Sequence, residues 1–270
     1  MRGTSQRSRD AVVRAFAPVA LAAGKDGTRL AEQLFAVVDT VDGSASLRRA
    51  LTDPARPGSD KDVLVGSLFG ALDARARTVV ADAVASRWSH EGDLAHALTD
   101  AGYEALFAAA ESAKVSGRVA DELFQVEREL VSQRALLLAV EDHASPRASR
   151  ATLVDSVFAS RVHPITLALV QRAVAAPRGE RVLTTIRQLI ETSVQRESRL
   201  VASVTSAVEL SAAQRARLSD ILTRAYGRGV QINVAIDPEV LGGIKVQVGS
   251  DVVDGTVLTR LDDARRRLVG

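Results

Sequence analysis

The chain has 270 residues, of which 46% are hydrophobic and only 3% aromatic, so its cores must consist mainly of alanine, valine and leucine. It contains no cysteine, which excludes disulfides, thiolate metal sites and cysteine nucleophiles. The 35 basic and 33 acidic residues are interspersed and leave a net charge of only +2, which disfavours a strongly basic nucleic-acid-binding surface.

No segment of the sequence predicts a bilayer span. The longest uncharged apolar run, Ala135 to Val140, is far shorter than the roughly 20 residues that a spanning helix needs. The arginine-rich start also lacks the apolar stretch of a signal peptide. We therefore expect the protein to work in the cytoplasm.

An internal repeat organises the first 200 residues. Residues 31–69 align without a gap on residues 120–158, and 13 of these 39 positions are identical, including matched Phe, Pro and Asp. Because a bias toward alanine and leucine does not produce such matches, we interpret them as two copies of one unit. We place the copies at 1–100 and 101–200, followed by a C-terminal module at 201–270.

Each copy predicts a helical bundle, because apolar residues recur every three or four positions in its long segments. In the first copy these residues are Val12, Phe16 and Val19, then Leu30, Leu34, Val37 and Val41. In the second copy they are Tyr103, Leu106, Phe107 and Ala110, then Val119, Leu123, Val126 and Leu130, and then Val182, Ile186, Leu189, Ile190 and Val194. Shorter helices are expected at 133–141, 148–160 and 164–176.

The two copies are predicted to share one helix. The closing helix of the second copy, shifted back by the repeat spacing, falls at 92–111 and overlaps the opening helix of that same copy. Gly102 is the only helix-weakening residue in the overlap. We therefore expect a nearly continuous helix that makes the copies a stiff tandem.

The C-terminal module predicts a β-α-β-β-α order. Residues 201–208 alternate weakly as a strand, and Ser211 with Gln214 forms a capping box at the start of a helix. Two alternating runs follow, 230–236 and 244–248, with Pro238 and a double glycine between them, which alone would be a hairpin-like connection. Residues 251–255 predict a turn before a closing helix.

These two runs carry a family resemblance. Their pattern resembles the C-terminal signature of the F-type ATP synthase delta subunit family, the bacterial equivalent of the oligomycin-sensitivity-conferring protein. The residues that carry it are Val230, Ile232, Ile236, Asp237, Val240, Gly242, Gly243, Ile244, Val246, Gln247 and Gly249. The helical copies resemble the N-terminal bundle of that family, which normally has one. The fold class expected is mainly α, with two tandem helical bundles and a small α+β module.

The resemblance implies a mechanical function without catalysis. The family joins the catalytic head of ATP synthase, through an alpha subunit N-terminus, to the b-subunit stator, and it resists torque during proton-driven ATP synthesis. It implies a location on the cytoplasmic face of the plasma membrane, contact with the membrane only through the complex, no nucleic acid, no cofactor and no homo-oligomer.

The resemblance also implies a docking groove for an alpha-subunit helix. Because the family places its bundle directly before the C-terminal module, we assign this groove to the second copy. The candidate residues are Tyr103, Leu106 and Phe107 on its opening helix and Leu167 and Val170 on its fifth.

Residue patterns for catalysis or metal binding are weak. Residues 24–28 contain glycine, lysine and threonine but lack the spacing of a phosphate-binding loop. The histidines form no ligand pair at metal-binding spacing, and a surface role is favoured for each of His90, His96, His143 and His163. We predict no catalytic, cofactor-binding or metal-binding residues.

An RNA-binding function is the alternative. The delta-type bundle is similar in fold to an all-α transcription antitermination factor, and 31 of the 35 basic residues are arginine. Acidic residues interrupt nearly every basic cluster, however, and no arginine stripe has interleaved aromatics. The C-terminal signature also has no counterpart in that factor.

Overall fold

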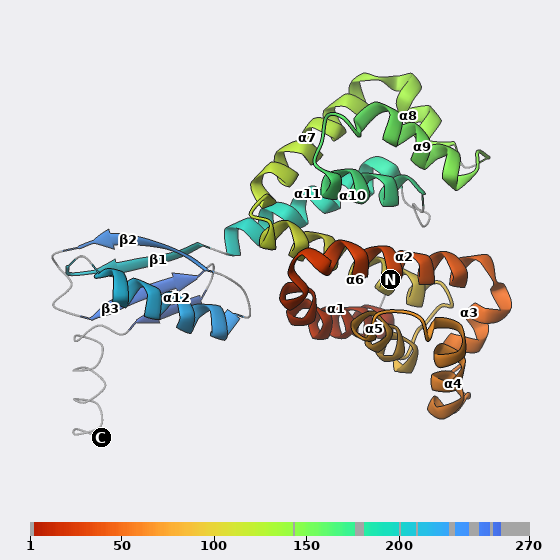
Figure 1. The fold of residues 1–270 in the computed structure, drawn as a ribbon, viewed down its shortest axis with the longest axis horizontal. Coiled ribbons are helices and arrows are strands. Elements are labelled where there is room, and N and C mark those ends of the chain that lie inside the picture. Colours follow the sequence, from red (N-terminus) through yellow and green to blue (C-terminus); the bar gives the residue numbers. More distant parts are fainter. Residues whose placement is uncertain are drawn as a thin grey trace. The chain divides into compact units, whose positions relative to one another are not determined.

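The structure is a computed structural model of the chain. It describes residues 3–142, 144–175, 181–199, 201–208, 210–226, 230–237, 243–248 and 251–254. The chain packs into two compact units, residues 1–193 and 194–270 (Figure 1). In the described residues the first unit is helical and all strands lie in the second, which confirms the predicted fold class.

The first unit contains two successive sets of helices. The first set is α1 (Thr4–Ala23), a 3₁₀ turn (Gly24–Asp26), α2 (Gly27–Gly43), α3 (Ala45–Thr52), α4 (Gly58–Phe69), α5 (Ala74–Ala85) and α6 (Asp93–Ser112). The second set adds α7 (Ser116–Ser132), α8 (Arg134–Glu141), α9 (Arg147–Phe158), α10 (Pro164–Ala175) and α11 (Val182–Arg199), of which residues 182–193 lie in the first unit. The helices of the second set start 89 residues after their counterparts, or 90 for α10, which is the spacing of the predicted repeat.

Helix α6 belongs to both sets, as the sixth helix of the first and the opening helix of the second. It runs unbroken through Gly102, which confirms the predicted continuous helix. Fourteen of its 20 residues are buried, and eight of these are alanine or glycine. Helices α1, α2, α5, α7 and α10 all pack on it, and one stripe that includes Asp100, Glu104 and Glu111 stays half-buried. A division of the repeat near residue 100 therefore passes through α6.

Small residues set how closely the helices approach α6. A Cβ atom on Gly27 of α2 would lie 2.6 Å from the backbone oxygen of Ala105, and one on Gly102 would overlap the ring of Phe35. Interiors pack densely enough that one added methyl group is felt. These two glycines are therefore required by packing, and not by backbone conformation.

The fifth helix of each set, α5 or α10, is held at its first turn by a side chain from the second helix, α2 or α7. In the first set, Gln33 accepts a hydrogen bond from the backbone N–H of Asp73 at 3.1 Å. In the second set, Glu122 accepts from the backbone N–H of His163 and from the Thr166 hydroxyl, both at 2.7 Å. The amide and the carboxylate thus satisfy the same unpaired donor at a helix start.

Glu122 is buried and ionised. Burial alone would raise its pKa, but hydrogen bonds from Thr166, Arg118 and the His163 backbone together hold the pKa of Glu122 below its ordinary value. Arg118 donates to the other carboxylate oxygen at 2.6 Å. The carboxylate therefore joins α7 to α10 in its charged form.

A second pair of equivalent side chains donates hydrogen bonds to the C-terminal ends of α5 and α10. Lys61 and Arg150 hold the same position in the two copies, and both are buried. Lys61 Nζ donates to the carbonyl of Val84 at 3.4 Å, and Arg150 Nη1 donates to the carbonyl of Val174 at 2.9 Å. A cation at a helix C-terminus satisfies a free carbonyl and is favoured by the helix dipole.

The two sets contact each other directly between α2 and α10. The Phe35 ring lies over Gly102, meets the Tyr103 ring edge-on with centroids 5.8 Å apart, and has the Arg172 guanidinium 4.8 Å from its centroid. Arg172 Nη1 donates to Asp39 Oδ1 at 2.8 Å. Arg172 is only 5% exposed, and its Nε and Nη2 atoms have no hydrogen-bond partner. We infer that this contact, called the Phe35–Arg172 contact below, fixes the angle between the sets.

The second unit is a four-stranded sheet packed against one helix. Its elements are β1 (Val201–Ser206), α12 (Ala212–Tyr226), β2 (Gln231–Ile236), β3 (Ile244–Val248) and β4 (Asp251–Asp254), with strand order β2-β1-β3-β4. β1 and β2 are parallel and joined through α12, and the other neighbours are antiparallel. The predicted capping box is confirmed, with reciprocal hydrogen bonds between Ser211 and Gln214 of 2.9 and 3.2 Å.

Two expectations for this unit were wrong. The runs that form β2 and β3 are not a hairpin, because each pairs with β1 on opposite sides. Residues 251–254 are not a turn but a strand, in which Val252 and Val253 supply the β-branched residues that suit a sheet. The predicted closing helix lies outside the described residues.

Two substitutions of Glu122 should distinguish how much its hydrogen bonds and its charge each contribute to the free energy of unfolding. Glu122→Ala leaves buried donors without an acceptor and should cost about 1–3 kcal/mol in the free energy of unfolding. Glu122→Gln should cost less, because Gln33 already fills this position in the first set. Urea unfolding of the full chain measures both, and equal losses would contradict the assignment.

The same variants predict a pH dependence. Because folding lowers the pKa of Glu122, its charge stabilises the fold at neutral pH, and this contribution is lost as the pH falls through the lowered pKa. In Glu122→Gln the unfolding free energy should therefore depend less on pH in the acid range than in the wild type. An unchanged acid limb would show that the Glu122 charge contributes nothing.

A matched pair of glycine substitutions tests the packing around α6. Gly66→Ala lies in α4, where an added Cβ meets nothing within 4 Å, and should stabilise the fold by about 0.5–1 kcal/mol. Gly102→Ala should destabilise it by about 1–3 kcal/mol, because the Phe35 ring cannot move without breaking its contacts. A stabilising Gly102→Ala, measured by thermal unfolding, would refute the packing argument.

Candidate functional site

The five residues predicted to receive a helix divide between core and surface. Leu106, Phe107 and Val170 are at most 4% exposed and belong to the core of the first unit. Tyr103 and Leu167 are half-buried. The three buried residues can support a docking surface from below, while direct contact with a partner is left to the half-buried pair.

A groove lies beside the half-buried Tyr103. Its floor is α6, its walls are α1 and α11, and its volume is about 140 Å³; the lining residues are Arg9, Val13, Asp100, Tyr103, Glu104, Phe107, Thr185, Gln188, Leu189 and Thr192. An ion pair of 2.5 Å joins Arg9 Nε to Asp100 inside it. Small-molecule sites usually occupy about 300–1,000 Å³. This groove is therefore too small and too polar for an ordinary ligand site.

The outer face of α10 is more apolar than its counterpart in the first set. The face, called the α10 strip below, consists of Pro164, Leu167, Ala168 and Gln171, which helical spacing places side by side. The corresponding residues on α5 are Ala74, Arg77, Thr78 and Ala81. Leu167 thus replaces an exposed arginine, and only the second set offers an apolar anchor at this place.

The signature residues divide between a core and a turn. Val230 and Val246 are buried in the core beneath α12, Ile232 and Ile244 pack against it, and Ile236 is 57% exposed. Gly243 has φ of 84°, a backbone conformation that only glycine adopts without strain. Glycine is therefore favoured at position 243 by its backbone conformation. Val240, Gly242 and Gly249 lie outside the described residues.

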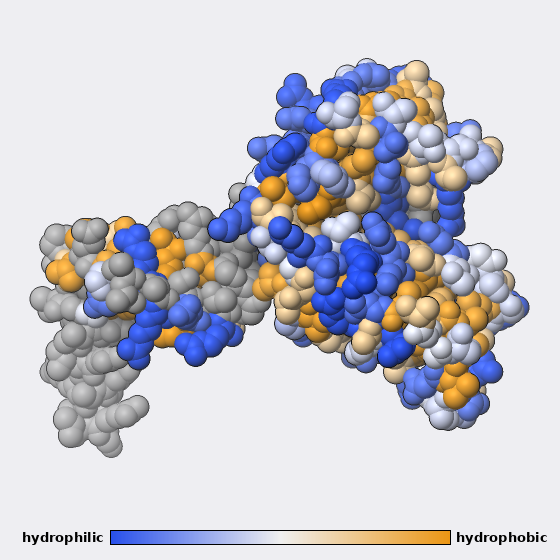
Figure 2. Space-filling view, in the orientation of Figure 1, coloured by the Kyte–Doolittle hydropathy of each residue, from blue (hydrophilic) through white to orange (hydrophobic). Residues whose placement is uncertain are grey.

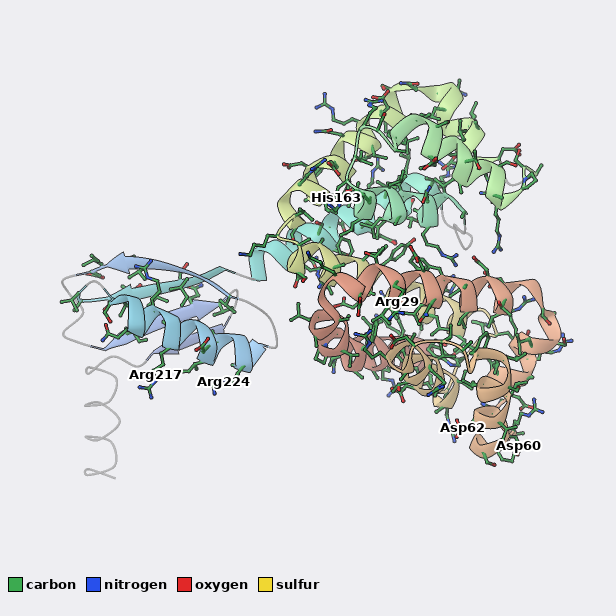
Figure 3. The ribbon with its side chains drawn as sticks, viewed as in Figure 1. Arg29, Asp60, Asp62, His163, Arg217 and Arg224 are labelled. Atoms are coloured by element: carbon green, nitrogen blue, oxygen red, sulfur yellow. The ribbon has the colours of Figure 1, made fainter. Side chains whose placement is uncertain are left out.

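Helix α12 presents a stripe that the sequence analysis did not identify. Leu218 and Leu222 pack in the core with the sheet, whereas Ile221 is 47% exposed. The exposed Arg217 and Arg224 precede and follow it on the same helix (Figure 3). We call Arg217, Ile221 and Arg224 the α12 stripe. The spacing of these three residues, at i, i+4 and i+7, was the available signal. An exposed apolar residue between cations suits an amphipathic helix with acidic flanks.

Elsewhere the surface is mixed. On the visible face of the first unit, hydrophilic and apolar residues alternate over short distances (Figure 2). In the part of the chain that the structure describes, no three His, Asp or Glu side chains cluster closely enough to hold a metal ion. Within the same residues, no helix is long and apolar enough to cross a membrane.

Comparisons with known proteins agree with the resemblance of the signature. The sequence profile described as ATP synthase delta (OSCP) subunit matches residues 103–268, so the match starts within α6. The protein named ATP synthase subunit delta from Beutenbergia cavernae is 49% identical over 100% of both chains. Its namesake from Streptomyces avermitilis is 42% identical over 90% of this chain and 89% of its own.

A third protein of that name, from Kineococcus radiotolerans, is 39% identical over 92% of this chain and 91% of its own. These relatives align across both helical sets and the second unit, whereas the profile leaves α1–α5 outside its match. The chain therefore belongs to the ATP synthase delta (OSCP) subunit family, whose members are non-catalytic subunits of that enzyme.

Proposed function

We propose that this chain links the catalytic head of ATP synthase to its b-subunit stator and resists rotational torque. In this arrangement the second helical set receives the N-terminal helix of an alpha subunit, and the second unit receives the stalk helices. The observation that carries the assignment is the α10 strip. A helix-binding surface needs an apolar anchor at its centre, and Leu167 supplies one where the first set has Arg77.

Resistance to torque requires that the two helical sets behave as one stiff body at the head attachment. The shared helix α6 joins the sets without a linker, and the Phe35–Arg172 contact ties α2 to α10 on its flank. Rotation of one set against the other would have to separate the buried Arg172 guanidinium from Asp39, whose side chain is 52% exposed, and would expose the apolar faces around α6.

The stalk contact is proposed at the α12 stripe. Ile221 supplies an exposed apolar anchor, and Arg217 and Arg224 supply charges for carboxylates on a partner helix. Asp220 borders the stripe, so the local charge is only mildly positive. Charges at an interface rim mainly set the partner, the association rate and the salt dependence.

A matched pair of variants tests the head contact. We expect Leu167→Asp to weaken binding of the alpha-subunit N-terminal peptide about tenfold or more, since a charge would replace the apolar anchor. Arg77→Asp, at the same place on α5, should leave the affinity unchanged. Calorimetric titration of the full chain measures both, with circular dichroism to show that the variants fold.

The milder Leu167→Gln guards against a folding defect in Leu167→Asp, because it keeps a side chain of similar length without charge. Loss of affinity on changing Arg77, with none on changing Leu167, would transfer the alpha contact to the first set.

Charge reversal tests the stalk contact. The double variant Arg217→Glu and Arg224→Glu should bind the helical peptide of the b subunit at least about tenfold more weakly at low salt, with a smaller difference at high salt. Arg215→Glu, exposed at another side of α12, is the control. Equal affinity of the double variant and the wild type, by fluorescence anisotropy, would place the stalk elsewhere.

A further inference from the structure

Phe124 on α7 holds the position in the second set that Phe35 holds on α2 in the first. The two phenylalanines have different surroundings. Phe35 is covered by α6 and by Arg172 of α10, whereas Phe124 is 45% exposed. A face that is partly covered by the other set in one copy is therefore open in the other.

The open face extends along α7. Val131 is 55% exposed and Arg128 is exposed, and their spacing of four and seven residues from Phe124 places all three on one side of the helix. We call Phe124, Arg128 and Val131 the α7 face. Exposed aromatic and branched apolar side chains gathered on one helix face are typical of a protein-binding surface.

A groove adjoins the α7 face. It has a volume of about 360 Å³ between α7 and the residues that follow α9, and its lining consists of Gln125, Val126, Arg128, Glu129, Ser132, Phe158, Arg161 and Val162. The guanidinium of Arg161 lies 6.0 Å from the centroid of the Phe158 ring and 3.6 Å from Glu129. Arg128 therefore belongs both to the exposed face and to a groove that holds a second arginine.

The contact made by α2 shows what chemistry fits such a face. Phe35 is seated on a glycine and beside an aromatic ring, and Asp39 accepts a hydrogen bond from Arg172. In the second copy the position of Asp39 is occupied by Arg128. The charge is reversed, so a partner for α7 needs a small residue opposite Phe124 and a carboxylate where α10 has its arginine.

We propose that the α7 face is a docking surface for an acidic amphipathic helix of another subunit. The helix would seat a small residue against Phe124, place apolar side chains on Val131, and direct a carboxylate to Arg128. This surface is separate from the α10 strip and the α12 stripe, so it adds to the proposed function and does not depend on it.

The test uses the full chain and designed peptides. The probe is a fluorescent helical peptide with an alanine and leucine stripe flanked by glutamates, and its counterpart carries lysines in place of the glutamates. We expect the acidic peptide to bind at least about tenfold more tightly than the lysine peptide. Phe124→Ser should weaken this binding about tenfold, and Arg128→Glu should reverse the preference between the peptides.

Val63→Ser is the control, because Val63 is a 73% exposed residue on α4 of the first set and should leave the affinity unchanged. All three changes are at exposed positions, and circular dichroism verifies that each variant folds. Equal binding of the two peptides by the wild type would overturn the proposal, as would an affinity that responds to Val63→Ser but not to Phe124→Ser. Self-association that Phe124→Ser abolishes would also overturn it in favour of a second copy.

Discussion

Close packing around α6 is the constraint on which the first unit depends. One helix must serve two cores, so 14 of its 20 residues are buried and its polar side is reduced to a half-buried stripe that includes His96, Asp100 and Glu104. Its neighbours can approach closely only if the residues between them are small. Gly27 and Gly102 mark the places where backbone or ring comes nearest. With only 3% aromatic residues, the chain reaches a dense interior by close approach of helices and not by large side chains.

The two sets satisfy the same backbone groups with different chemistry. Gln33 and Glu122 both accept from the N–H at the start of a fifth helix, and Lys61 and Arg150 both donate to a carbonyl at its end. The helix determines where such a side chain is needed, because the unpaired backbone N–H and C=O groups at its ends must form hydrogen bonds when they are buried. The side chain that satisfies them is free to vary if it keeps a donor or acceptor at the right distance.

Local patterns in the sequence predicted local structure well. The helical stripes, the continuous helix through Gly102 and the capping box at Ser211 all depend on residues close in sequence. Strand order was not predictable in the same way, because the pairing of β3 with β1 joins residues far apart and alternation does not name a partner.

The candidate site shows a further limit of sequence patterns. Apolar spacing cannot distinguish a side chain that forms the core from one that lines a groove, so Leu106, Phe107 and Val170 were grouped with Tyr103 and Leu167. Apolar spacing also could not predict the Phe35–Arg172 contact, because its residues lie on helices of different copies. Equivalent positions in the two copies carry more information, because their helices start 89 or 90 residues apart and differences in side chain or exposure can be compared position by position.

The shared helix also determines how such a chain can grow. Because α6 ends one set and begins the next, the second set required only five new helices, α7 to α11. A further copy added by the same rule would again contribute five, and α11 would become an internal helix. Its outer face would then have to lose exposed residues such as Val194 in favour of small buried ones. The exposed apolar and polar residues on α11 therefore suit it to be the last helix of the array and not an internal one.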